Sequence, residues 1–249
     1  MAQTAVVTGG AGGLGRAFTA ALATSGYDVI PVDIRGTERT VDVTDPAACR
    51  ALADDVRPVI WVNNAGLTGR GDVLDQEDSA IERIVATNLL GVIHGSRAAA
   101  RSMLAGAGGT ILNVASLSGW APTPHIAVYS ATKHAVRAFS VAFAAELRGT
   151  PVALRCLLPD GIRTPMVDVH DPRQLMSFTG RRLLDADDVA AAGVRLLRSG
   201  RLVASVPRRR GVPLRLLGIS SRLSLALQRP VERRAHRHQR RAAARMTDT

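Results

Sequence analysis

The chain has 249 residues, of which 46% are apolar, so it is long enough to bury the core of one large α/β domain or two small ones. Its net charge of +11 arises at one end, because residues 1–200 hold 19 basic and 19 acidic side chains, whereas residues 201–249 hold 13 arginines against Glu232 and Asp248. No apolar run approaches about 18 residues, which argues against a membrane span, and no basic-then-apolar signal peptide precedes the first strand.

The two cysteines, Cys49 and Cys156, have neither C-x-x-C nor metal-ligand spacing. We therefore expect two reduced thiols, no bound metal, and a cytoplasmic location.

Strand-like and helix-like segments alternate along most of the chain. Apolar runs predict strands at 3–8, 28–33, 59–62, 110–115, 152–158 and 201–206, with a third, short strand that ends near 41–43, and helical patterns fall at 14–24, 46–56, 78–104, 127–148 and 186–198. This alternation predicts an α/β fold with a doubly wound parallel sheet of the Rossmann type. Only eight residues separate Asp33 from Asp42, fewer than the dozen that a parallel crossover needs, so we expect a shortened crossover without a helix.

A glycine-rich segment, Thr8 to Gly15, lies between the first strand and the first helix. Glycines allow the backbone to approach a pyrophosphate, and the helix N-terminus supplies amide donors. Asp33 ends the second strand, where a carboxylate would bind an adenosine ribose hydroxyl and repel a 2′-phosphate. This favours NAD, although Arg16, Arg35 and Arg39 nearby leave NADP open. The alternatives are a glycine turn without a ligand and a simple strand-end aspartate.

The only lysine, Lys133, follows Tyr129 by four residues, whereas the other 31 basic residues are arginine. One helical turn places both side chains on the same face. The ammonium group would lower the tyrosine pKa toward working pH, which would make Tyr129 a general acid/base. The alternative is an ordinary pair on a solvated helix face.

These motifs, in this order, resemble those of the short-chain dehydrogenase/reductase family over about residues 4–206. The segments that carry the resemblance are Thr8–Gly15, Asp42-Val43, Asn63-Asn64-Ala65-Gly66, Asn88, Asn113–Ser116, Tyr129-x-x-x-Lys133 and Pro159-Asp160-Gly161-Ile162-Arg163-Thr164.

The resemblance implies a role for each matched position. Tyr129 would transfer a proton to or from the substrate oxygen, Lys133 would lower its pKa and hold the nicotinamide ribose, Ser116 would bind the substrate oxygen, and Asn88 would support a water relay. Cofactor contacts would come from Thr8, Gly9, Gly13, Leu14, Gly15, Asp33, Asp42, Val43, Asn64, Ala65, Gly66, Tyr129, Lys133, Pro159, Ile162 and Thr164. The implied reaction is hydride transfer between a nicotinamide cofactor and a secondary alcohol or ketone, and a homo-oligomer is expected.

Asp160 departs from the family pattern, which usually has glycine there, and it places a carboxylate near the expected nicotinamide site. On the substrate side, we expect Trp120, Pro122, Pro124, His125, Ile126 and Met166 to line a mostly apolar entrance, with 166–184 as a mobile lid. That lining favours an apolar small molecule. For His125 a solvent-facing position in the loop is the alternative to substrate binding.

We divide the chain into a catalytic domain, 1–206, and a basic, partly helical extension, 207–249. Leu216, Ile219, Leu223 and Leu227 recur at helical spacing between arginines. This pattern fits packing on the domain or on a partner subunit, or contact with an anionic membrane surface, whereas the absence of aromatic residues argues against nucleic acid. We expect catalysis to survive truncation near Pro207. A non-catalytic, nucleotide-binding or membrane-tethered protein is the alternative function.

Overall fold

The computed structural model of the protein describes residues 2–69, 72–164, 166 and 183–226. Within these residues seven parallel strands form one sheet in the order β3-β2-β1-β4-β5-β6-β7. The strands are β1 (Thr4–Thr8), β2 (Asp28–Asp33), β3 (Arg39–Thr40), β4 (Ile60–Asn63), β5 (Gly109–Val114), β6 (Val152–Pro159) and β7 (Val203–Val206). The order reverses direction between β1 and β4, which confirms the expected doubly wound sheet.

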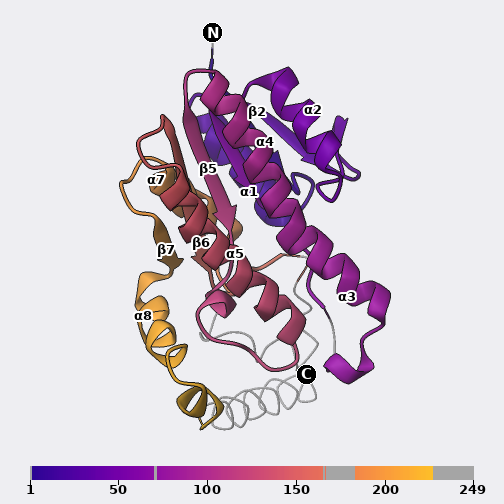
Figure 1. The fold of residues 1–249 in the computed structure, drawn as a ribbon, viewed down its shortest axis with the longest axis vertical. Coiled ribbons are helices and arrows are strands. Elements are labelled where there is room, and N and C mark those ends of the chain that lie inside the picture. Colours follow the sequence, from indigo (N-terminus) through magenta and orange to yellow (C-terminus); the bar gives the residue numbers. More distant parts are fainter. Residues whose placement is uncertain (1, 70–71, 165, 167–182, 227–249) are drawn as a thin grey trace, which may run out of the picture.

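Helices cover both faces of the sheet (Figure 1). The pair α1 (Gly13–Thr24) and α7 (Ala186–Leu197) packs on one face, and α2 (Pro46–Val56), α4 (Gly91–Ala105) and α5 (Ala127–Glu146) pack on the other. The helix α3 (Asp78–Val85) and the short turns η1 (Val73–Asp75) and η3 (Leu117–Gly119) follow strands β4 and β5 at their carboxyl ends.

Two buried clusters arise because successive strand residues point to opposite faces. Val6, Trp61, Ile111 and Leu154 stand in register across four strands and pack toward α2 and α4. Their neighbours along the strands, including Val7, Val62 and Leu112, face α1 and α7 on the other side. Apolar residues on both faces explain why these strands read as continuous apolar runs in the sequence.

Two predicted segments, the short connection after β2 and the helix at 78–104, have local details that the sequence does not indicate. The β2–β3 connection, residues 34–38, contains no helix, as its length predicts, and the third strand, Arg39–Thr40, ends one residue before the predicted 41–43. The last residue pair between β2 and β3 is Asp33 with Thr40. The chain turns after it, where the Asp42 side chain accepts a hydrogen bond from the Thr44 amide. The predicted helix at 78–104 is interrupted by a π-helical segment, η2 (Ala86–Leu90), between α3 and α4.

The helical part of the extension begins earlier than the spacing of Leu216, Ile219, Leu223 and Leu227 indicates. Helix α8 (Arg208–Leu217) begins directly after β7, includes Pro213, and is followed by helical residues 221–226. It packs beside the carboxyl end of β7, where a side chain at Gly211 would place its Cβ 2.2 Å from Ser205 Oγ. Of the described helices, none has the length and apolarity that crossing a membrane requires. The basic run at 233–241 and the greater part of the predicted lid lie outside the described residues.

Candidate active site

A cavity of about 800 Å³ opens at the carboxyl ends of the strands. It lies where the strand order reverses between β1 and β4, the position at which open α/β sheets bind ligands. All of the predicted site residues except Thr8 and Asn88 line this cavity: Gly9, Gly13, Leu14, Gly15, Asp33, Asp42, Val43, Asn64, Ala65, Gly66, Ser116, Tyr129, Lys133, Pro159, Ile162 and Thr164.

The glycine turn between β1 and α1 leaves no room for a side chain at Gly9 or Gly15. Gly9 has a φ of +66°, and a Cβ there would lie 2.8 Å from Ala65 Cα. A Cβ on Gly15 would lie 2.0 Å from the Gly9 carbonyl oxygen. Gly12 caps α1 without a side-chain hydrogen bond, so the first amides of the helix keep their donors available toward the cavity. This cradle fits the pyrophosphate of a dinucleotide.

Thr8 lies behind the cavity, where it joins two turns. Its hydroxyl donates to the Val62 carbonyl at 3.3 Å and accepts from the amides of Asn64 (3.0 Å) and Ala65 (3.1 Å). The Asn64 side chain donates in return to the carbonyl oxygens of Thr8 and Gly9. These bonds fix the turn after β1 against the turn after β4, so Thr8 positions the cofactor cradle rather than facing it.

Beside the glycine turn, Asp33 accepts from two backbone amides. Its Oδ2 accepts from Ala11 at 3.1 Å and its Oδ1 from Ile34 at 2.8 Å. Arg39 points elsewhere and pairs with Asp55 at 2.5 Å, whereas Arg16 also lines the cavity and donates to the Ala11 carbonyl. The site therefore holds a carboxylate suited to a ribose diol with one arginine beside it.

Ser116, Tyr129 and Lys133 converge at the centre of the cavity. Tyr129 and Lys133 lie one turn apart on α5, with Lys133 Nζ 5.5 Å from the centroid of the tyrosine ring. Lys133 Nζ donates to the Val114 carbonyl at 2.9 Å, which draws the ammonium group against the end of β5. Ser116 follows β5, caps the turn η3 and hydrogen-bonds the Tyr129 hydroxyl. A hydroxyl, a phenol and an ammonium group thus share one site.

The predicted lowering of the tyrosine pKa by lysine is wrong for this structure. Protein atoms packed around the hydroxyl raise the pKa of Tyr129 above its ordinary value, and the hydrogen bond from Ser116 opposes that rise. Lys133 is itself only 5% exposed, and burial lowers its own pKa to about 8. Desolvation disfavours the charged form of each group.

Asn88 belongs to the π-helical segment η2 and is completely buried. Its amide nitrogen donates to the Leu67 carbonyl at 2.8 Å, and its oxygen accepts from the Leu67 amide at 2.7 Å. A second, longer bond reaches the Thr132 hydroxyl at 3.3 Å. Asn88 thereby fixes the backbone that follows β4 against α5, close to Gly66 and Lys133, and is not an amide on the helix surface.

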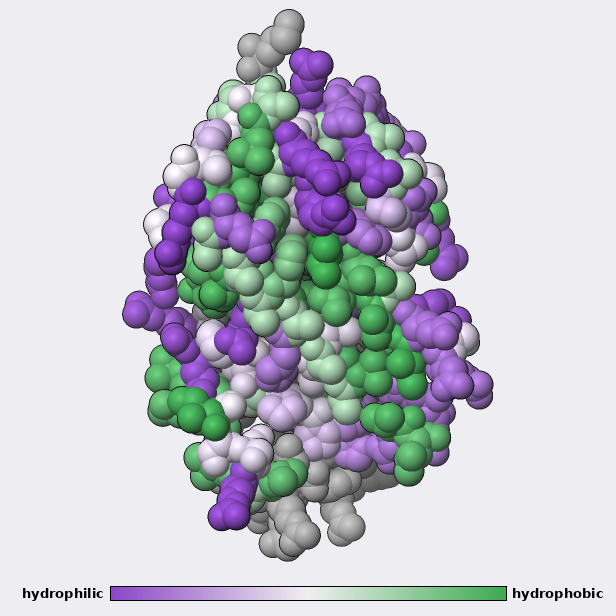
Figure 2. Space-filling view, in the orientation of Figure 1, coloured by the Kyte–Doolittle hydropathy of each residue, from purple (hydrophilic) through white to green (hydrophobic). Residues whose placement is uncertain are grey.

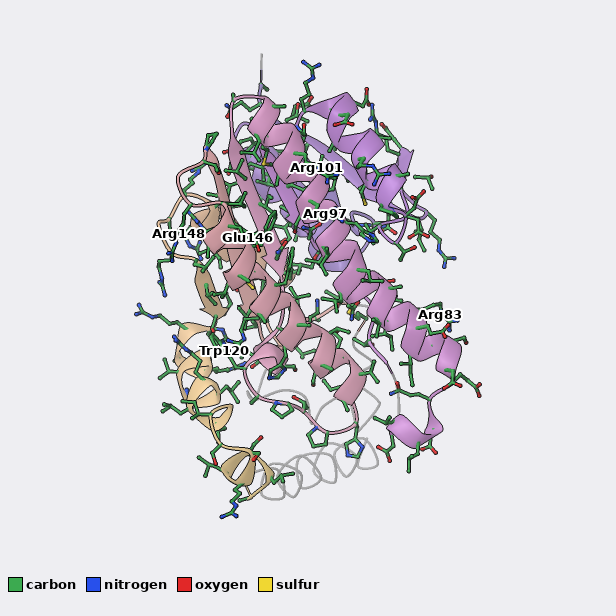
Figure 3. The ribbon with its side chains drawn as sticks, viewed as in Figure 1. Arg83, Arg97, Arg101, Trp120, Glu146 and Arg148 are labelled. Carbon is green, nitrogen blue, oxygen red and sulfur yellow. The ribbon has the colours of Figure 1, made fainter. Side chains whose placement is uncertain are left out.

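The predicted substrate entrance is correct only in part. Ile126 and Met166 line the cavity, whereas Trp120, Pro122, Pro124 and His125 do not. Trp120 lies between α5 and α8 (Figure 3), where its indole Nε1 donates to Ser205 Oγ at 3.1 Å. His125 has a φ of +62° and pairs with Asp72, so it joins its loop to the segment before η1.

Several residues at or beneath the site are not among the predicted site residues. Arg83 of α3 (Figure 3) and Thr87 of η2 line the cavity. Beneath it lies a buried network of Trp61, Asn63, Ser96, Asn113 and Ser140, which links β4, α4, β5 and α5. The sequence signal for this network is an asparagine near the end of each of two apolar strands, Asn63 in β4 and Asn113 in β5. A buried amide side chain there needs hydrogen-bond partners.

Comparison with known proteins agrees with this geometry. The family model for short chain dehydrogenases matches residues 3–174. A 3-alpha-(or 20-beta)-hydroxysteroid dehydrogenase from Mycobacterium tuberculosis is 32% identical over 185 residues, covering 67% of this chain and 71% of the relative.

Two solved structures are similar over most of the chain. A short chain dehydrogenase/reductase from Burkholderia phymatum in complex with NAD has a TM-score of 0.76 and 25% identity, covering 86% of this chain and 92% of that one. A putative NAD(P)-dependent gluconate 5-dehydrogenase from Beutenbergia cavernae with bound NADP has a TM-score of 0.71 and 26% identity, covering 78% and 89%.

Proposed function

The chain belongs to the short-chain dehydrogenase family, and from that premise we propose that its cavity binds NAD and carries out hydride transfer to or from an apolar secondary alcohol or ketone. The family assignment makes the protein an NAD(P)-dependent oxidoreductase of CH–OH and C=O groups. The observation that carries the proposal is the convergence of Ser116, Tyr129 and Lys133 beside a glycine cradle in which two glycines have no room for a side chain.

Each residue of the site has a separate role in the proposed reaction. When bound, the nicotinamide cofactor supplies the site that accepts or donates hydride. The Tyr129 hydroxyl exchanges a proton with the substrate oxygen, and Ser116 Oγ donates to the same oxygen as charge develops on it. Lys133 places its ammonium group beside the phenol ring, held by the Val114 carbonyl, where it can bind the nicotinamide ribose. Asn88 keeps the backbone of Leu67 and the start of α5 in place around this centre.

Asp33 supports NAD over NADP. Its carboxylate is fixed by two amides at the end of β2, where it can accept hydrogen bonds from a ribose diol and would repel a 2′-phosphate. Arg16 keeps NADP possible as the weaker cofactor. The substrate proposal draws on apolar lining residues, among them Ile126 and Met166, and on the hydroxysteroid dehydrogenase relative.

Fluorescence titration with NADH and with NADPH, followed by a screen of 3α- and 20β-hydroxysteroids and simpler secondary alcohols, tests this function. We expect tighter binding of NADH and turnover of at least one apolar alcohol. Binding of neither cofactor would contradict the proposal and would favour a different ligand for the cavity.

A second proposal concerns the surface of the C-terminal segment. Val212, Leu216, Ile219, Leu223 and Leu225 are 45–80% exposed, and the exposed Arg208, Arg209 and Arg222 lie among them. Apolar side chains flanked by arginines suit an anionic lipid surface. Sedimentation with vesicles should show binding when they contain phosphatidylserine and little when they are pure phosphatidylcholine. A Leu216→Ser/Ile219→Ser variant should lose that binding and keep cofactor affinity; equal sedimentation with both vesicles would refute it.

We also propose that the protein forms a homo-oligomer. Hydrophobic residues lie over α5 and between α5 and α4 (Figure 2), and Leu104 and Val141 are nearly half exposed. Arg97 and Arg101 of α4 also lie on this side (Figure 3). Burial of the hydrophobic residues against a second copy would remove them from water. Light scattering should give a mass at least twice 26.3 kDa, and a Val141→Glu variant should lower it.

A further inference from the structure

A buried ion pair lies at the nicotinamide end of the proposed site. Asp160 follows β6 and lines the cavity together with Ile162 and Thr164. Its side chain is 2% exposed, and its Oδ2 lies 2.5 Å from Nη1 of Arg210, which is 18% exposed. Its other oxygen accepts from the Gly161 amide at 2.8 Å. An arginine from the C-terminal helix therefore meets a carboxylate on the wall of the catalytic cavity.

The position of Arg210 is fixed by the docking of α8. Arg137 of α5 and Arg215 of α8 both lie over the Trp120 ring, at 4.2 and 4.7 Å from its centroid. A Cβ on Gly218 would lie 2.0 Å from the Trp120 carbonyl oxygen, so the end of α8 approaches this loop as closely as glycine allows. Trp120 follows η3, the turn that Ser116 caps. The helix thus contacts the loops that follow both β5 and β6.

The charge of Asp160 bears directly on the cofactor that we propose for this cavity. The nicotinamide ring is positively charged when oxidised and neutral when reduced, so any fixed charge nearby changes the affinity of one form more than the other. A carboxylate alone would favour the oxidised form, and Arg210 offsets it. We propose that the Asp160–Arg210 pair sets the relative affinity of the site for oxidised and reduced cofactor. Helix α8 then contributes a residue, Arg210, to the nicotinamide site.

This inference rests on the proposed function, since it requires the nicotinamide to bind near Asp160. It also reverses the expectation that catalysis would survive truncation near Pro207, because such a truncation removes Arg210 and leaves a buried carboxylate without this partner. Removing one partner of a buried ion pair is strongly destabilising.

The Asp160→Asn variant gives the sharpest test. Asparagine keeps an oxygen for the Gly161 amide, while Arg210 stays charged because arginine does not deprotonate in proteins. At an effective dielectric constant of about 20, a unit charge within about 10 Å changes an affinity roughly ten-fold. We therefore expect the affinity for NAD⁺ to fall roughly ten-fold relative to the affinity for NADH. Affinities would be measured by NADH fluorescence and by calorimetry with NAD⁺, independently of turnover.

Two further variants separate charge from structure. In Asp160→Asn/Arg210→Met the site is again neutral, and the NAD⁺/NADH ratio of dissociation constants should return to within about two-fold of the wild type. Arg209→Gln removes an exposed arginine one residue away and should leave the ratio unchanged. An equal loss of both affinities in Asp160→Asn would mean a structural role alone and would overturn the inference.

If Asp160→Asn does not fold, Arg210→Gln decides the matter, because it removes the positive charge that offsets the carboxylate and should make NAD⁺ bind more tightly relative to NADH. An unchanged ratio in this variant would overturn the inference. Failure of the wild type to bind either cofactor would instead contradict the proposed function itself.

Discussion

Replacement of Lys133 by methionine should stabilise the fold at neutral pH even though it removes a proposed catalytic group. Burial lowers the Lys133 pKa from 10.5 to about 8. A depressed lysine pKa means that the folded state binds fewer protons than the unfolded state between pH 8 and 10.5. Wild-type stability linked to this group is therefore lowest below pH 8 and rises as the pH approaches 10.5.

The magnitude follows from this shift. A fall of the pKa from 10.5 to about 8 corresponds to about 3 kcal/mol at pH 7 and to about 1 kcal/mol at pH 9.5. Loss of the hydrogen bond to the Val114 carbonyl offsets about 1 kcal/mol at both pH values. Methionine matches the lysine stem in volume, so packing changes little. The variant should be more stable by about 2 kcal/mol at pH 7 and nearly equal to the wild type at pH 9.5.

Urea unfolding of both proteins at the two pH values measures this directly, because the other titrating groups are common to both and largely cancel. A stability difference that does not change between pH 7 and pH 9.5 would refute the reasoning, since it would mean that Lys133 titrates normally in the folded protein.

Three other predictions follow from the geometry of the site. Gly15→Ala should abolish NADH binding in a fluorescence titration, because its Cβ would lie 2.0 Å from the Gly9 carbonyl oxygen; wild-type affinity would contradict this. Asp33→Asn should narrow the preference for NADH over NADPH by about ten-fold, and an unchanged ratio of dissociation constants would remove Asp33 as the selector. Asn113→Ala should cost about 2–4 kcal/mol in urea unfolding because it strands buried partners in Asn63 and Ser140, whereas Thr24→Ala, at an exposed hydrogen bond, should cost less than about 0.5 kcal/mol.

The sequence predicts the sheet and the cavity well because short-range signals determine them. Glycines at 9 and 15 mark a turn that excludes side chains, and the apolar runs around Val6 and Trp61 mark strands buried on both faces. The Tyr129/Lys133 spacing is a property of one helix and needs no tertiary contact to be recognised.

Long-range contacts are what the sequence does not reveal. Nothing near Asp160 in the chain points to Arg210, which lies fifty residues later and is brought to it by the docking of α8. The rise of the Tyr129 pKa likewise depends on how tightly the folded protein surrounds the hydroxyl, which no spacing of residues encodes. Trp120 sits in the expected loop but turns toward α8 because two arginines flank its ring there.

The measurement that tests the central claim most directly is a comparison of Tyr129→Phe with the wild type. Phenylalanine keeps the ring and removes the hydroxyl that we assign to proton transfer. We expect kcat for any accepted alcohol to fall by roughly a hundred-fold or more, with NADH affinity unchanged within about two-fold. Activity close to that of the wild type, with NADH still bound, would contradict the role of Tyr129 as the acid/base of the reaction.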